Sequence, residues 1–94
     1  MNNEQNTIEN QEINFPVSYV LKVVVTQNMR PEQHQGLIEE ILERKKIPFR
    51  FEDVKPSNKG TYLSFSVFIT LIDKNQMDEL YLELKTLPWI KMAL

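Results

Sequence analysis

Residues 61–72 read TYLSFSVFITLI, and the arrangement of the other elements can be worked out from this segment. Apolar side chains occupy every second position along it, and a period of two is typical of a β-strand with one buried face. The four residues before it, Ser57-Asn58-Lys59-Gly60, have the composition of a β-turn. We therefore expect a hairpin with the strand that precedes the turn. The predicted core face contains Leu63, Phe65, Val67, Ile69 and Leu71.

Three further strands are expected around this one. Residues 17–26 alternate in the same way, and residues 47–55 place Ile47, Phe49 and Phe51 on one face. That alternation breaks near Asp53, which indicates a bulge or the end of the strand. Residues 89–94 form a short last strand, in which Ile90, Met92 and Leu94 lie opposite Trp89, Lys91 and Ala93.

Two helices separate these strands. Pro31 suits the first turn of one helix, whose apolar stripe comprises Leu37, Ile38, Ile41 and Leu42. Gly36 is costly inside a helix, so we expect it to permit close approach to the sheet or to the other helix. Asp73 and Gln76 form a capping box for the second helix, and Pro88 ends it.

The order strand-helix-strand-strand-helix-strand predicts a split βαβ, or ferredoxin-like, α+β sandwich. We expect a four-stranded antiparallel sheet in the order 4-1-3-2, with both helices on one face. Residues 15–94 form this single domain. Residues 1–14 are rich in Asn, Gln and Glu and contain three acids and no base, so we expect a disordered acidic tail.

Composition excludes several functions. The chain of 94 residues has no cysteine and a single histidine, which excludes thiol chemistry, cysteine metal sites and multi-histidine metal sites. We expect no cofactor. Residues 15–94 are nearly neutral, which disfavours nucleic-acid binding because phosphate neutralisation supplies most of that affinity. No signal peptide or apolar membrane span is evident, so we expect a cytoplasmic protein that does not enter a membrane.

Two candidate sites follow. The sheet face turned away from the helices is expected to dock a second subunit or another protein, or simply to carry the scattered apolar residues of any surface. The segment from Lys55 to Tyr62 is either a solvated hairpin turn or a small anion site made by lysines and turn amides. The predicted face contains Val20, Lys22, Val24, Phe68, Trp89 and Lys91, and the predicted anion site contains Lys55, Ser57, Lys59, Gly60 and Tyr62.

Two rival functions have little support in the residues. Lys59-Gly60 is similar to the opening of an RNA-recognition strand, but Thr61 and Leu63 stand where stacking aromatic residues are needed. Arg30 lies in the first strand-helix loop, as in acylphosphatases, but the glycine-rich phosphate cradle is missing. We expect His34 to be a surface or half-buried helix residue, and we expect no catalytic residue.

The sequence Lys-Pro-Ser-Asn-Lys-Gly-Thr-Tyr at residues 55–62 resembles the YbeD-like family of small bacterial proteins, as does the ending at residues 90–94. The resemblance implies an ACT-like fold without an established activity. ACT domains typically pair and bind small effectors, often through a glycine that the loop at residues 26–30 lacks. The predicted function is therefore a non-enzymatic regulatory or protein-interaction module that uses its sheet face or edge. The alternative is a small-ligand or anion sensor that uses the turn between Lys55 and Tyr62.

Overall fold

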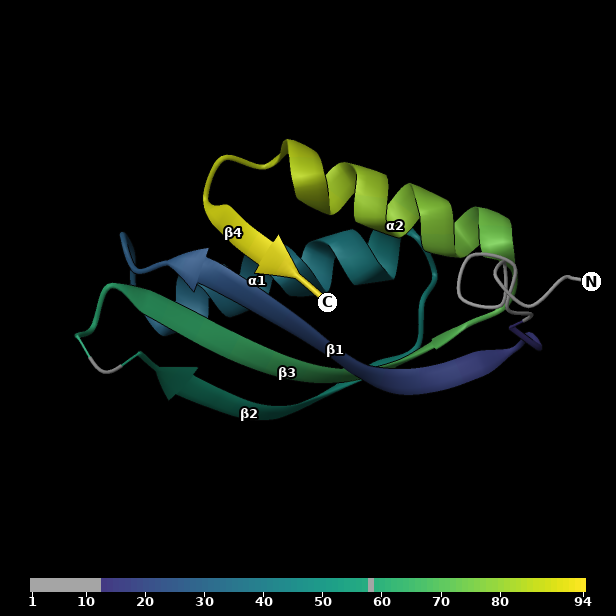
Figure 1. Ribbon diagram of the computed structural model, residues 1–94, viewed down its shortest axis with the longest axis horizontal. Coiled ribbons are helices and arrows are strands. Elements are labelled where there is room, and N and C mark those ends of the chain that lie inside the picture. The colour runs from purple at the N-terminus through teal and green to yellow at the C-terminus, as the bar shows by residue number, and fades with distance from the viewer. Residues whose placement is uncertain (1–12, 58) are drawn as a thin grey trace, which may run out of the picture.

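The computed structural model describes residues 13–57 and 59–94, and most of the predicted acidic tail lies outside the described residues. The elements are β1 (Val17–Thr26), α1 (Pro31–Arg44), β2 (Phe49–Pro56), β3 (Tyr62–Leu71), α2 (Lys74–Thr86) and β4 (Ile90–Ala93). The sheet has the order β2-β3-β1-β4, and its neighbouring strands are antiparallel. Figure 1 shows both helices packed against one side of the sheet. The predicted ferredoxin-like fold and strand order are confirmed.

The core lies between the sheet and the two helices. Alternate residues of β1 and β3 face the helices, and their side chains are almost completely buried. Burying one such side chain contributes about 1.5–3 kcal/mol. The residues of the core are Leu21, Val23, Val25, Ile38, Ile41, Leu42, Ile47, Leu63, Phe65, Val67, Ile69, Leu71, Leu80 and Leu84.

The buried stripe of α1 differs from the predicted one at its first turns. His34 is completely buried, so the expectation of a surface or half-buried histidine is wrong. Leu37 lies at the rim with 36% of its surface exposed. A Cβ atom added at Gly36 would meet nothing within 4 Å, so the predicted close approach is also wrong. The phase of the helix explains all three, because His34, Ile38 and Ile41 follow one face at i, i+4 and i+7.

The pairing of neighbouring strands is interrupted at two places, and each interruption changes the face on which the following side chains lie. Phe51 pairs with Val67 and Asp53 with Ser66, which leaves Glu52 as the extra residue of a bulge. The predicted bulge is confirmed, and β2 continues beyond it to Pro56.

The second irregularity lies between β1 and β4. Val24 pairs with Met92 and Val25 with Ile90, so Lys91 is the extra residue. The predicted strict alternation of the last strand is therefore wrong. The extra residue changes the phase, so Ile90 and Ala93 pack against the core while Met92 is exposed.

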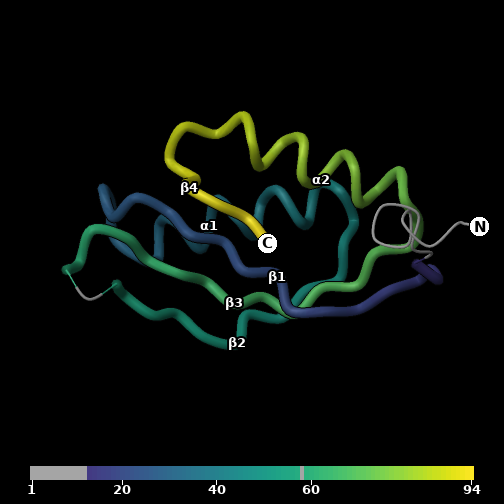
Figure 2. The backbone as a smooth tube through the Cα atoms, in the orientation of Figure 1, coloured from purple at the N-terminus to yellow at the C-terminus, as the bar shows by residue number. Residues whose placement is uncertain are grey.

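Gln76 ties α2 to the end of α1. The Asp73 carboxylate accepts a hydrogen bond from the Gln76 main chain at 2.8 Å, as the predicted cap requires. The Gln76 side chain accepts from the Ile72 main chain at 2.9 Å and donates to the Lys45 carbonyl at 3.1 Å. These hydrogen bonds hold the first turn of α2 against the end of α1. Farther along, α2 lies beside β4 at the edge of the sheet (Figure 2).

Candidate functional site

The open sheet face, which we define as the side of the sheet turned away from the helices, brings together five of the six predicted residues. Val20 lies opposite Phe68, and the neighbouring positions of β1 hold Lys22 and Val24. Val20 is 39% exposed, which is high for an aliphatic residue in a central strand. Arg50 from β2 places its guanidinium 4.9 Å from the centre of the Phe68 ring, within the range of a cation–π contact.

Trp89 does not belong to this face. Its ring centre lies 5.4 Å from that of the buried His34, and it packs against the core. The sequence placed Trp89 by strict alternation, and the bulge at Lys91 breaks that alternation. Lys91 does reach the open sheet face, where its ammonium lies 5.9 Å from the centre of the Tyr62 ring.

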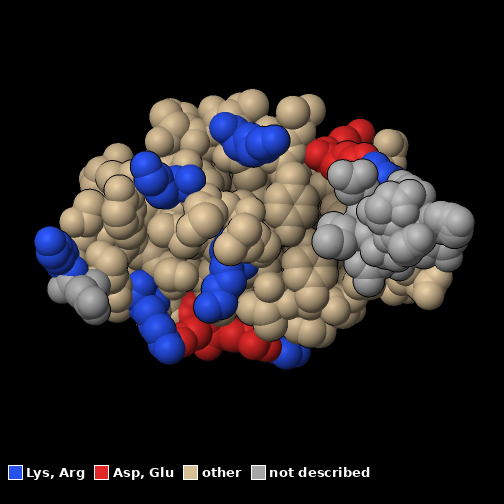
Figure 3. All heavy atoms as spheres, viewed as in Figure 1, with Lys and Arg blue, Asp and Glu red and all other residues tan. Residues whose placement is uncertain are grey.

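The open sheet face carries unbalanced positive charge. On β2, Arg50 pairs with Glu52 at 2.7 Å and Lys55 with Asp53 at 3.7 Å. Lys22 and Lys91 form no salt bridge with any residue that the structure describes. In Figure 3 one acidic group lies along the lower edge, where β2 runs, and a second lies at the upper right, while separate basic groups stand on the surface between them. An apolar and basic surface of this kind suits an acidic partner.

The two helices carry the opposite charge. They contain seven acidic side chains against three basic ones, whereas the strands contain two acidic against four basic. The acidic residues of the helices are Glu32, Glu39, Glu40, Glu43, Asp78, Glu79 and Glu83.

The predicted anion site lies in the β2–β3 turn. Gly60 adopts a φ of +72° and donates to the Ser57 carbonyl at 3.0 Å, while the Ser57 main chain donates to Tyr62 at 2.8 Å. The Tyr62 main chain donates to the Ser57 hydroxyl at 3.1 Å. The turn amides of these three residues are thus used inside the turn, and Lys59 lines a shallow hollow of about 330 Å³ beside Tyr62.

The residues considered for catalysis are not brought together. Arg30 is an exposed residue that contacts Glu32 at 3.7 Å, and His34 is buried away from it between Trp89 and Phe65. Burial lowers the pKa of His34 from its ordinary value. No cluster of three metal-binding side chains occurs within residues 13–57 and 59–94.

The Glu83 carboxylate lies between two basic side chains. The Arg44 guanidinium binds it at 2.6 Å and the Lys45 ammonium at 3.1 Å, and together they lower its pKa to about 2. This cluster joins α1 to α2 near the surface. Its geometry is that of a structural ion pair, because both partners only hold the carboxylate in its charged form.

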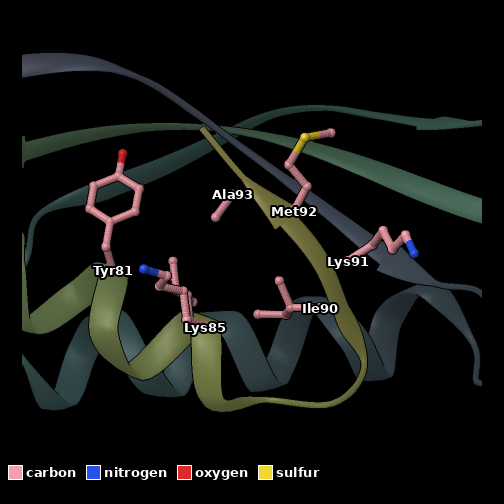
Figure 4. Close-up of a pocket in the computed structure, with 7 residues that line it drawn as sticks. Tyr81, Lys85, Ile90, Lys91, Met92 and Ala93 are labelled. Carbon is pink, nitrogen blue, oxygen red and sulfur yellow. The ribbon is translucent and has the colours of Figure 1, made fainter.

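A second hollow, which we call the edge groove, lies between α2 and β4 and was not predicted. It has a volume of about 430 Å³ and is lined by Tyr81, Leu84, Lys85, Ile90, Lys91, Met92 and Ala93. Figure 4 shows the Tyr81 side chain rising from α2 toward the sheet and the Lys85 side chain ending on the side of Tyr81, whereas the Lys91 side chain points away. Among the residues lining it there is no acid. Sequence periodicity carries no signal for this groove, because it depends on how short β4 is and where α2 lies against it.

Within the described part of the chain, neither helix is long and apolar enough to cross a membrane.

Comparison with known proteins identifies several similar chains. The family model described as "Protein of unknown function (DUF493)" matches residues 10–94. A UPF0250 protein of Yersinia pestis (strain Pestoides F) is 34% identical over 85 residues, which cover 90% of this chain and 94% of that protein. The solution structure of protein HP0495 from H. pylori matches with a TM-score of 0.73 at 18% sequence identity, and the match covers 100% of this chain and 98% of the HP0495 chain. The C-terminal domain of the MgtC protein from Mycobacterium tuberculosis covers 88% of each chain, with a TM-score of 0.65 and 14% identity. At these identities the two structures support the fold alone.

Proposed function

This chain belongs to the DUF493 (UPF0250) family of proteins of unknown function, and we propose that it is a non-enzymatic regulatory or protein-interaction module. YbeD belongs to the same family, so the resemblance predicted from the sequence is confirmed. The proposal places the module in the cytoplasm, with the absence of cysteine from the sequence in support.

The observation that carries this proposal is the open sheet face. Val20 and Phe68 form an apolar pair at its centre, and Lys22 and Lys91 stand beside it without a salt-bridge partner among the described residues. Apolar groups supply the free energy of docking, while unpaired charges select a partner of opposite sign. The occupant is therefore a protein whose apolar contact surface is bordered by acidic side chains.

A second copy of the chain fits this face less well. If two open sheet faces met, Lys22 and Lys91 of both copies would lie in one interface. Like charges brought together in this way are unfavourable. We therefore assign the face to a different protein, and self-association is one of the outcomes of the test.

Affinity capture from a bacterial lysate tests the proposal when variants are compared. The face variant combines Val20→Ser with Lys22→Glu. The control combines Leu82→Ser with Lys74→Glu, which changes an exposed leucine and an exposed lysine on α2. We expect a defined partner to be retained by the wild type and the control and reduced at least about tenfold by the face variant, as expected for the loss of about 1.4 kcal/mol.

Equal capture by the face variant and the control would contradict the proposal. Sedimentation of the purified protein completes the test. A dimer that the face variant abolishes would assign the face to a second copy instead.

The hollow beside the β2–β3 turn supports the second candidate, an anion-sensing site. Ser57, Lys59, Thr61 and Tyr62 line it, whereas the turn amides are already used. Titration with inorganic phosphate, followed by the amide resonances of Gly60 and Tyr62, tests this candidate. Shifts that saturate in the wild type and disappear in Lys59→Ala would support it, and unchanged resonances would refute it.

A further inference from the structure

The sheet edge formed by β1 and β4 is only partly closed. β4 pairs with Val23–Val25, and Leu94 exchanges main-chain hydrogen bonds of 2.9 and 2.8 Å with Lys22. The earlier part of β1, residues 17–21, has no strand on this side within residues 13–57 and 59–94. Figure 2 shows β4 ending partway along β1, so that no strand among the described residues covers the rest of the β1 edge.

The main-chain groups of Ser18 and Val20 face this uncovered edge. Residues of an antiparallel strand bond alternately toward one neighbour and the other, and Lys22 bonds toward Leu94. Val20 and Ser18 lie two and four positions before Lys22 and therefore point the same way. Neither has a main-chain partner on that side among the described residues. Unpaired N–H and C=O groups in a row are the template on which an extended peptide adds to a sheet.

The edge groove lies beside this row. The Tyr81 hydroxyl from α2 is hydrogen-bonded to the Tyr19 hydroxyl, which lies between Ser18 and Val20 on β1. Tyr81, Ile90 and Ala93 provide apolar walls, and the Lys85 ammonium is the charged group directed into the groove (Figure 4). A strand added along the row would direct alternate side chains toward α2, and therefore into the groove.

We propose that this edge and groove bind a short extended segment of a partner protein, with apolar side chains for the groove and a carboxylate for Lys85. The inference rests on the proposed function as an interaction module and adds the chemistry of the bound segment. Five residues of β1 are available, which corresponds to about 17 Å of strand at a rise of about 3.3 Å per residue.

Pairing of two β1 edges is disfavoured as an alternative. Adjacent strands lie about 4.8 Å apart, whereas packed helices need about 8–10 Å between their axes. The helix α2 of each copy lies along the same edge, so both helices would have to share the space over one pair of strands. A single peptide strand brings no helix and avoids this conflict.

Capped synthetic hexapeptides test the proposal on the full-length protein. The first, Ile-Thr-Glu-Thr-Val-Thr, places its apolar side chains and its carboxylate on one face. The second peptide carries Lys in place of Glu. The third peptide has the sequence of the first but carries N-methyl groups on alternate residues, so that one edge of its backbone cannot donate hydrogen bonds. Binding is measured by fluorescence anisotropy, and the contact is located from the amide resonances of Ser18 and Val20.

We expect the Glu peptide to bind at least about tenfold more tightly than the Lys peptide, a difference of about 1.4 kcal/mol. Lys85→Glu should reverse this preference, and N-methylation should abolish binding. Two control variants should retain it, namely Lys74→Glu at the other end of α2 and Lys22→Glu on the open sheet face.

Three outcomes would overturn the proposal. They are equal affinity of the N-methylated peptide, the absence of shifts at Ser18 and Val20, and a dimer that shifts these resonances without peptide. Because the Lys22→Glu variant addresses the open sheet face separately, failure at the edge leaves the proposed docking on that face to be decided by its own test.

Discussion

The replacement of His34 by leucine tests how the core accommodates a buried polar ring. Neither ring nitrogen has a hydrogen-bond partner among the described residues, and each such buried group costs about 1–3 kcal/mol. Leucine has a similar volume and no polar atom, but it gives up contacts with Trp89 and Phe65 worth about 0.5–1.5 kcal/mol each. We therefore expect His34→Leu to raise the free energy of unfolding by about 1–2 kcal/mol at neutral pH.

The same replacement should remove a dependence of stability on pH. Burial lowers the pKa of His34 in the folded protein below the ordinary value of 6.5. Below this pH the unfolded chain binds a proton that the folded chain binds less readily. The stability that depends on neutral His34 is therefore complete above pH 6.5 and is lost as the pH falls below it. The slope can reach about 1.4 kcal/mol per pH unit.

Urea denaturation of three proteins measures both effects. Trp89 is the only tryptophan and lies beside the His34 ring, so its fluorescence reports on this part of the core, and circular dichroism reports on the whole fold. His34→Gln keeps a buried polar group that cannot titrate, so it should lose the pH dependence without the gain in stability. The reasoning would be refuted if wild type and His34→Leu lost stability in parallel between about pH 7.5 and 5.5, or if the leucine variant were less stable throughout.

The two glycines and Glu83 provide further predictions. Gly36→Ala should raise the free energy of unfolding by about 1 kcal/mol, because the added Cβ meets nothing within 4 Å and alanine favours helix. Gly60→Ala should lower the free energy of unfolding by about 1 kcal/mol, because Gly60 has a φ of +72° and alanine is strained in that conformation. Urea denaturation of the two variants shows whether each one is more or less stable than the wild type. Glu83→Gln should lower stability by about 1 kcal/mol at neutral pH, since the carboxylate binds Arg44 and Lys45 near the surface. Because the pKa of Glu83 is lowered from 4.5 to about 2, this contribution should be present above pH 4.5 and lost toward pH 2 in an acid titration of both proteins.

The fold follows from signals that lie close together in the chain. The alternation in residues 61–72, the turn before it and the cap at Asp73 each concern a few neighbouring residues. The order of the strands then follows from the handedness of the crossovers. These signals agree with one another, which explains why the strand order could be predicted from the sequence.

The candidate surfaces were predictable only in part. Val20, Lys22, Val24 and Phe68 meet on the open sheet face because β1 and β3 pair without interruption. Trp89 was placed on the wrong side, since a single extra residue reverses the alternation of β4 and no local signal marks it.

Sequence patterns alone predicted which segments are strands and helices, which residues of β1 and β3 enter the core, and which family the chain belongs to. The arrangement in space was needed to show that His34 is buried, that Trp89 covers it, and that β4 leaves part of β1 unpaired among the described residues. These features could not be predicted because they arise where segments far apart in the chain meet. Three such features change the surface where segments meet: the rotation of a helix about its axis, a bulge between two paired strands, and the short length of β4, which has four residues. None of them changes the hydrophobic periodicity of the sequence.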